Sequence, residues 1–84
     1  MIEIYIKQDC PYCHNVLRRT AELGLRQGKD FKIVNAPKGS KGREVILEVG
    51  GIGQVPFLID GKTHMYESED IIKYIEEKFK QIKT

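Results

Sequence analysis

The sequence is short of cysteine, of long apolar runs and of net charge. Its 84 residues include only two cysteines, too few for a disulfide scaffold. The longest apolar stretch covers residues 55–59, far below the roughly 20 residues of a membrane-spanning helix, and the first 25 residues contain no run typical of a signal peptide. The net charge is only +2, which disfavours a nucleic-acid binder held by phosphate contacts. We therefore expect one small cytoplasmic domain, with neither a membrane nor a nucleic acid as partner.

The first half of the chain predicts a strand, a helix and a second strand. Residues 2–6 and 31–35 are rich in β-branched and aromatic side chains, which favour strands. Between them, apolar residues recur at helical spacing from Pro11 to Gly24, and proline suits the first turn of a helix as glycine suits its end. Because a helix connects them, the two strands are expected to be parallel.

The second half predicts a short helix followed by a hairpin. Ser40 is a candidate N-cap for a helix that ends at Gly50. Residues 55–59 and 62–66 flank Asp60-Gly61, a strong signal for the turn of an antiparallel hairpin.

A last helix completes the predicted order βαβ-α-ββα. Ser68 is its expected cap, and the acidic residues that follow favour the positive end of the helix dipole. Its apolar face consists of Ile71, Ile75, Phe79 and Ile82.

Cys10 and Cys13 are placed for redox chemistry. The pair lies where the first strand ends and the first helix begins, and the N–H groups at a helix N-terminus favour an anion. Cys10 is therefore the candidate nucleophile, with Lys7 adding positive charge, and Cys13 is placed to attack a mixed disulfide formed on it. Two other interpretations are open: structural thiols, and half of a zinc site completed by His14 and His64. A C-x-x-C pair that opens a helix after a strand favours the redox hypothesis.

Pro56 is unusual because it lies inside the predicted strand 55–59. Proline occurs in strands mainly at sheet edges. The alternative is a cis peptide bond that leaves backbone groups free for a ligand. The sequence is compatible with both.

Several of these features together resemble glutaredoxins. They are the CPYC tetrapeptide after a first strand, Val55-Pro56 before a strand, the Asp-Gly hairpin and the final helix with its acidic start. The resemblance covers nearly the whole chain and implies one glutaredoxin domain over residues 1–84. The implied fold is thioredoxin-like, a four-stranded mixed sheet flanked by three helices. The implied activity is glutathione-dependent reduction of glutathione mixed disulfides and protein disulfides.

The same resemblance implies a role for each site residue. Cys10 is the nucleophile and Cys13 the resolving thiol. The glycine carboxylate of glutathione is assigned to basic residues, the cysteinyl unit to the backbone before Pro56, and the γ-glutamyl end to the start of the last helix. The implied glutathione-binding residues are Lys7, Tyr12, Arg43, Val55, Pro56, Ser68 and Glu69.

Three features depart from the glutaredoxin pattern. Gln54 replaces the usual threonine, and Asp9 places a negative charge beside Cys10. In place of a Gly-Gly pair stands Tyr66-Glu67-Ser68, which resembles the glutathione-binding end of a glutathione transferase N-terminal domain. We nevertheless do not expect a lone transferase domain, because the chain ends without the helical domain that would hold a second substrate.

The leading hypothesis is a monomeric dithiol enzyme with glutathione as co-substrate and no metal. Its partners would be disulfide-containing or glutathionylated proteins and, indirectly, glutathione reductase. One alternative is a hydrogen donor reduced by thioredoxin reductase. The other is a protein that holds an iron–sulfur cluster between subunits through Cys10 and glutathione thiols.

Overall fold

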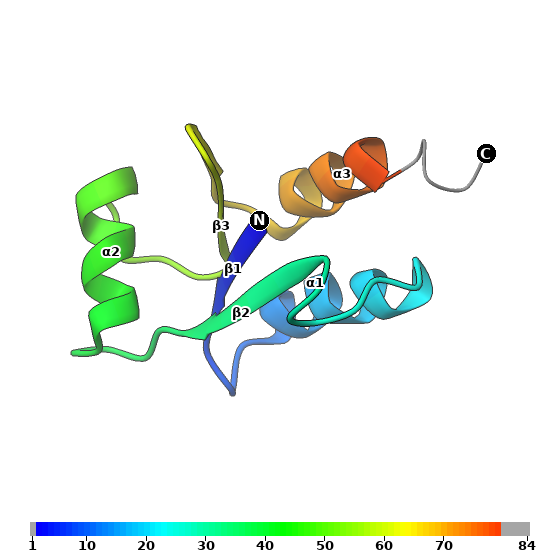
Figure 1. Ribbon diagram of the computed structural model, residues 1–84. Helices are drawn as coiled ribbons and strands as arrows, with labels where there is room; N and C mark the ends of the chain where they lie inside the picture. Colours follow the sequence, from blue (N-terminus) through cyan, green and yellow to red (C-terminus); the bar gives the residue numbers. More distant parts are fainter. Residues whose placement is uncertain (1, 80–84) are drawn as a thin grey trace.

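A four-stranded mixed sheet forms the centre of the molecule. The computed structural model describes residues 2–79. The strands run in the order β2-β1-β3-β4 across the sheet, and three helices surround them (Figure 1). The strands are β1 (Ile2–Ile6), β2 (Phe31–Asn35), β3 (Phe57–Asp60) and β4 (Thr63–Met65). The helices are α1 (Pro11–Glu22), α2 (Lys41–Gly50) and α3 (Ser68–Phe79).

The pairing of the strands confirms the predicted topology. β1 runs parallel to β2, with Ile4 opposite Ile33, and α1 forms the crossover between them. β3 is antiparallel to both β1 and β4. The strand order therefore matches the mixed sheet with three helices that the glutaredoxin resemblance implied.

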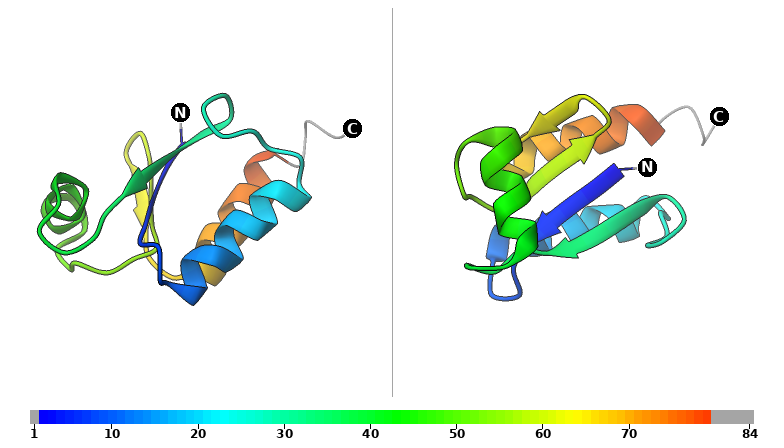
Figure 2. Two further views of the ribbon diagram at one scale, coloured as in Figure 1. Left: turned by 90° about the horizontal axis from the view of Figure 1, so that it is seen from below. Right: turned by 60° about the vertical axis from the view of Figure 1, so that its left-hand side comes forward.

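Helices cover both faces of the sheet. α1 and α3 lie side by side on one face, and α2 lies on the other (Figure 2). The alternation of side chains in a strand sends Ile2, Ile4 and Ile6 of β1 into the core beneath α1 and α3. Tyr5 points to the opposite face, where it packs with Ile46 of α2. Both faces of β1 are thus buried, which fixes it as the central strand.

Gly42 has no side chain, and this lets α2 approach the sheet closely. A Cβ atom on Gly42 would lie 2.7 Å from the carbonyl oxygen of Asn35 at the end of β2. Ser40 caps the helix as predicted, because its Oγ accepts a hydrogen bond from the N–H of Arg43 at 3.2 Å. The first turn of α2 is therefore anchored against the carboxyl end of β2.

Polar contacts attach α3 to its neighbours. The Arg19 guanidinium of α1 donates to the Glu76 carboxylate of α3 at 2.7 Å. At the β3–β4 turn, the Asp60 carboxylate accepts hydrogen bonds from Tyr74 and Lys78 of α3. These contacts hold the second half of α3 against α1 and the β3–β4 turn.

Two predicted boundaries need correction. β3 begins at Phe57 and not at residue 55, because Val55 and Pro56 take no part in the ladder. α3 begins at Ser68 itself, so Glu67 occupies the position before the helix that was predicted for Ser68. The apolar face of α3 includes buried Ile71 and Ile75, whereas Ile82 lies outside the described residues. Within residues 2–79, no helix combines the length and hydropathy needed to cross a membrane.

Candidate functional site

Cys10 occupies the N-cap of α1. Its backbone is extended, with φ −110° and ψ 108°, and Pro11 starts the first turn. The Cys10 Sγ accepts a hydrogen bond from the backbone N–H of Cys13 at 3.1 Å. A side chain at this position receives a donor that the helix would otherwise leave unpaired, and the helix dipole favours a negative charge there. Cys10 therefore has the N-cap geometry that is typical of nucleophilic cysteines.

Both cysteines are buried, Cys10 with 7% of its surface exposed and Cys13 with 0%. Both are free thiols. Burial, reinforced by a hydrogen bond with the Cys10 side chain, raises the pKa of Cys13 to about 12. The Cys13 thiol is consequently protonated at neutral pH.

The loop before Cys10 carries its own polar contacts. Lys7 pairs with Asp9 at 3.5 Å, and the Asp9 side chain is 83% exposed. His14 contacts the carbonyl oxygen of Gln8 at 2.7 Å through its Nε2. The Asp9 charge is therefore directed to Lys7 and solvent. Lys7 also lines a hollow of about 500 Å³ formed by Gln8, Asp9, Asn35, Pro37 and Lys38.

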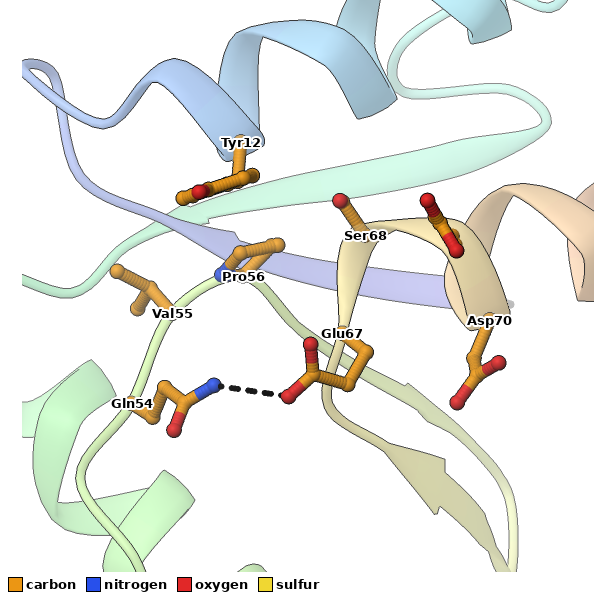
Figure 3. Close-up of a pocket in the computed structure, with 8 residues that line it drawn as sticks. Tyr12, Gln54, Val55, Pro56, Glu67, Ser68 and Asp70 are labelled. Carbon is orange, nitrogen blue, oxygen red and sulfur yellow. Dashed lines mark hydrogen bonds between the residues drawn. The ribbon is translucent and has the colours of Figure 1, made fainter.

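A cleft of about 500 Å³ opens between the start of α1, the loop before β3 and the start of α3. Figure 3 shows Gln54 and Val55 on one side, Glu67 and Ser68 on the other, and Tyr12 of α1 above them. The lining residues are Tyr12, Gln54, Val55, Pro56, Glu67, Ser68, Glu69 and Asp70. Five of the residues implied for glutathione binding are thus brought together, and one of them, Tyr12, lies in α1 two residues after Cys10.

The wall of the cleft that contains Val55 offers backbone groups to a ligand. The Val55–Pro56 peptide bond is cis, which confirms one of the two predictions for Pro56. Within residues 2–79, neither the N–H nor the carbonyl of Val55 makes a hydrogen bond with the protein. An extended ligand segment can therefore pair with Val55 in the manner of an added strand.

The far wall of the cleft is acidic and conformationally unusual. Glu67 has φ +64°, and it is the one non-glycine residue with positive φ in the described part of the chain. Its carboxylate accepts a hydrogen bond from the Gln54 side-chain amide at 3.5 Å (Figure 3). Left-handed backbone costs a residue with a side chain about 1–2 kcal/mol. Such conformations concentrate at ligand-binding positions, which makes Glu67 a candidate functional residue.

Arg43 does not reach this cleft. Its Nε donates to the carbonyl oxygen of Ala36 at 2.9 Å, and its Nη1 donates to the carbonyl oxygen of Gly53 at 3.0 Å. The guanidinium thus joins α2 to the loop before β3. Lys7 likewise lines the other hollow and not the cleft.

Three lining residues were not assigned from the sequence: Gln54, Glu67 and Asp70. The sequence did mark Gln54 and Glu67, because both lie in segments that depart from the glutaredoxin pattern. For the zinc hypothesis, residues 2–79 contain no group of three or more His, Cys, Asp or Glu side chains that could hold a metal ion. His64 packs instead against Phe57, with ring centroids 5.9 Å apart.

Comparisons with known proteins point to glutathione transferases. The family model described as "Glutathione S-transferase, N-terminal domain" matches residues 4–82. "Glutathione S-transferase F10" of Arabidopsis thaliana is 33% identical over 65 residues, which cover 75% of this chain and 30% of that protein. The chain thus spans less than a third of the length of this relative.

Solved structures agree in fold. Glutathione transferase Omega 3C from Trametes versicolor superposes with a TM-score of 0.79 at 22% identity, over 93% of this chain and 33% of that one. A delta-class glutathione transferase of Nilaparvata lugens gives a TM-score of 0.77 at 21% identity, over 94% and 36% of the two chains. The thioredoxin-like fold is thereby confirmed. The relatives are glutathione transferases and not specifically glutaredoxins, so the resemblance holds for the wider group alone.

Proposed function

The chain belongs to the family of glutathione S-transferase N-terminal domains, and from this premise we propose that it is a glutathione-dependent thiol–disulfide oxidoreductase. The observation that carries the proposal is the N-cap position of Cys10, whose Sγ accepts the Cys13 N–H beside a cleft. A protein thiolate at this position is a nucleophile for disulfide sulfur. The second thiol, Cys13, lies one turn further along α1.

Glutathione is proposed to occupy the cleft in an extended conformation. Its cysteinyl unit pairs with the backbone of Val55, next to Pro56, and Tyr12 borders it. Its γ-glutamyl carboxylate accepts N–H groups at the start of α3, near Ser68.

Acidic side chains then receive the ammonium group of the γ-glutamyl unit. Glu69 was assigned this role from the resemblance, and Glu67 joins it because its carboxylate lines the same cleft. Lys7, proposed for the glycine carboxylate, lines the other hollow, so its ammonium group would have to leave Asp9 to reach that end of the ligand. Arg43 is assigned instead to holding the loop, since its guanidinium already donates to two backbone carbonyls.

The proposed reaction on a glutathionylated protein has two exchanges. The Cys10 thiolate attacks the glutathione sulfur of the mixed disulfide, a new S–S bond joins Cys10 to glutathione, and the protein substrate leaves as a thiolate that takes up a proton. A second glutathione, as thiolate, then attacks the sulfur of the bound glutathione. Glutathione disulfide forms and the Cys10 thiolate is regenerated. The net exchange converts the mixed disulfide and one glutathione into the protein thiol and glutathione disulfide.

Reduction of a protein disulfide is proposed to require both cysteines. Cys10 attacks one sulfur and releases the other as a thiolate. Cys13 loses its proton and attacks the Cys10 sulfur, so that a Cys10–Cys13 disulfide forms and the reduced substrate leaves. Two glutathione molecules return the pair to the dithiol form and leave as glutathione disulfide.

Glutathione conjugation is the second candidate function, favoured by the transferase relatives. It differs chemically, because the thiolate of glutathione and not Cys10 would attack an electrophile. The sequence leaves two other hypotheses open, which are reduction of this protein by thioredoxin reductase and binding of an iron–sulfur cluster. Turnover with thioredoxin reductase and NADPH tests the first, and absorbance of anaerobically purified protein tests the second.

The deciding experiment follows turnover of a glutathionylated peptide with glutathione, glutathione reductase and NADPH. Wild-type protein and Cys13→Ser should be active, and Cys10→Ser should be inactive. Conjugation of glutathione to a chloronitrobenzene is measured in parallel. Conjugation by the wild type without any peptide turnover would replace the oxidoreductase proposal with the transferase one.

A further inference from the structure

We infer that Tyr66 is a positioning residue that sets the geometry of the cleft by joining its two walls. The inference rests on the proposed function, because the cleft is taken as the glutathione site. Tyr66 is the residue before Glu67 and does not itself line the cleft.

The phenol of Tyr66 makes two hydrogen bonds to one residue of the opposite wall. Its hydroxyl donates to the carbonyl oxygen of Ile52 at 2.5 Å and accepts from the N–H of Ile52 at 3.0 Å. Ile52 lies 14 residues earlier in the chain, on the loop that leads to Gln54 and Val55. One side chain thus satisfies both backbone groups of a loop residue.

The surroundings hold the phenol in this position. Its ring packs on Phe57, with centroids 4.6 Å apart. Gly50, the last residue of α2, leaves room for the hydroxyl, because a Cβ atom there would lie 2.2 Å from the Tyr66 oxygen. A tyrosine at position 66 and a glycine at position 50 therefore form a matched pair.

The loop is held from its other side as well. The Arg43 Nη1 donates to the carbonyl oxygen of Gly53, the residue after Ile52. Beyond these anchors, the Gln54 amide reaches Glu67 across the cleft. Gly51, Ile52 and Gln54 are all exposed, so hydrogen bonds and not burial hold this loop.

A ligand that contacts both walls needs them at a fixed separation. The proposed pose uses Val55 on one wall and Ser68 on the other, two residues beyond Tyr66. Without the Tyr66 hydroxyl, the loop would have to be ordered during binding, and that cost would weaken affinity. The thiol chemistry of Cys10 would be unaffected, because Tyr66 makes no contact with α1 through its hydroxyl.

The test compares Tyr66→Phe with Tyr74→Phe. Both changes remove one phenol hydroxyl that is hydrogen-bonded within the fold, but the Tyr74 hydroxyl donates to Asp60 at the hairpin, away from the cleft. Calorimetry measures binding of S-methylglutathione, which cannot exchange disulfides. We expect Tyr66→Phe to raise its Kd about five-fold or more, as loss of one or two hydrogen bonds allows, and Tyr74→Phe to leave it unchanged. Alkylation of Cys10 should proceed at the same rate in all three proteins.

Amide exchange at Ile52 reports directly on the contact. Its N–H should exchange faster in Tyr66→Phe than in the wild type or Tyr74→Phe. Equal Kd values for Tyr66→Phe and wild type would overturn the positioning role while leaving the proposed function intact. Equal weakening by both variants would show a general loss of stability and would also overturn it. A wild type that does not bind S-methylglutathione would overturn the glutathione cleft, and this inference with it.

Discussion

Replacing Cys13 by serine separates the two proposed routes. Turnover of glutathionylated substrates needs only Cys10 and external glutathione, so Cys13→Ser should stay within about two-fold of wild type, the margin expected where no transition-state contact is lost. Direct reduction of a protein disulfide needs the second thiol and should be lost. Cys10→Ser, the matched control, should abolish both activities.

The burial of Cys13 sets the size of the expected effect on the resolving step. A thiol whose pKa rises from 9.0 to about 12 carries about a thousandfold less thiolate at pH 7. The more basic thiolate is more nucleophilic. With a Brønsted coefficient of about 0.4–0.5, its rate constant rises roughly twenty-fold, which offsets part of the loss of thiolate. The net result is a resolving step at most about 50-fold slower than that of an unburied thiol in the same place, because the part of the pKa rise that comes from the Cys10 thiol is lost once Cys10 carries glutathione. External glutathione therefore competes well for the mixed disulfide on Cys10.

The assay starts from protein that carries glutathione on Cys10 and follows the Cys10–Cys13 disulfide by acid quench and mass spectrometry. Because attack requires the Cys13 thiolate, the rate should rise about tenfold per pH unit between pH 6 and 9. A rate that levels off near pH 7 would show that Cys13 ionises far more easily than its burial implies. Equal inactivity of Cys13→Ser and Cys10→Ser on the glutathionylated peptide would refute the division of roles.

Two further predictions concern the acidic side chains. Urea denaturation should give Glu67→Gly a free energy of unfolding about 1 kcal/mol higher than that of Glu67→Ala, because glycine accepts the positive φ of this position. Equal free energies of unfolding would contradict the left-handed backbone. Asp60→Asn should lower the free energy of unfolding at pH 7 by about 1 kcal/mol, since the hydrogen bond from Lys78 and then that from Tyr74 hold the pKa of Asp60 below its ordinary value. A depressed pKa gives stability that is present above the unfolded pKa and is lost as the pH falls through the folded one. The two proteins should therefore converge in acid, and a difference that persists at pH 2 would argue against the ion pair.

Local patterns were sufficient to predict most of the fold. The strands at 2–6 and 31–35 and the helix that begins at Pro11 follow from side-chain periodicity and from the fixed backbone of proline. The start of β3 was misplaced because apolar residues continue through Val55 and Pro56, although neither pairs with β1. Periodicity records burial and β-propensity, but the loss of ladder hydrogen bonds at a proline depends on its neighbours in the sheet.

The site was predicted less completely, because its contacts join distant parts of the chain. Arg43 was expected to meet a ligand carboxylate, and only the folded loop supplies the two carbonyls that it binds. The hydrogen bond between Gln54 and Glu67 and the contact of Tyr66 with Ile52 span 13 and 14 residues. No local pattern marks such pairs. The positive φ of Glu67 was equally hidden, since a glutamate gives no signal for a left-handed backbone.

The position of Cys10 bears on which of the two candidate reactions the cleft can support. The described contacts at the start of α1 give one backbone donor to the reactive sulfur, the N–H of Cys13, and Cys10 already accepts it. A glutathione thiolate bound in the same cleft would have to share that donor and the same helix dipole with a second negative sulfur close by. Two negative sulfurs that share one donor would repel each other. An S–S bond between the two sulfurs removes this conflict, because neither sulfur then carries a charge. This electrostatic argument favours disulfide exchange through Cys10 over activation of free glutathione for conjugation.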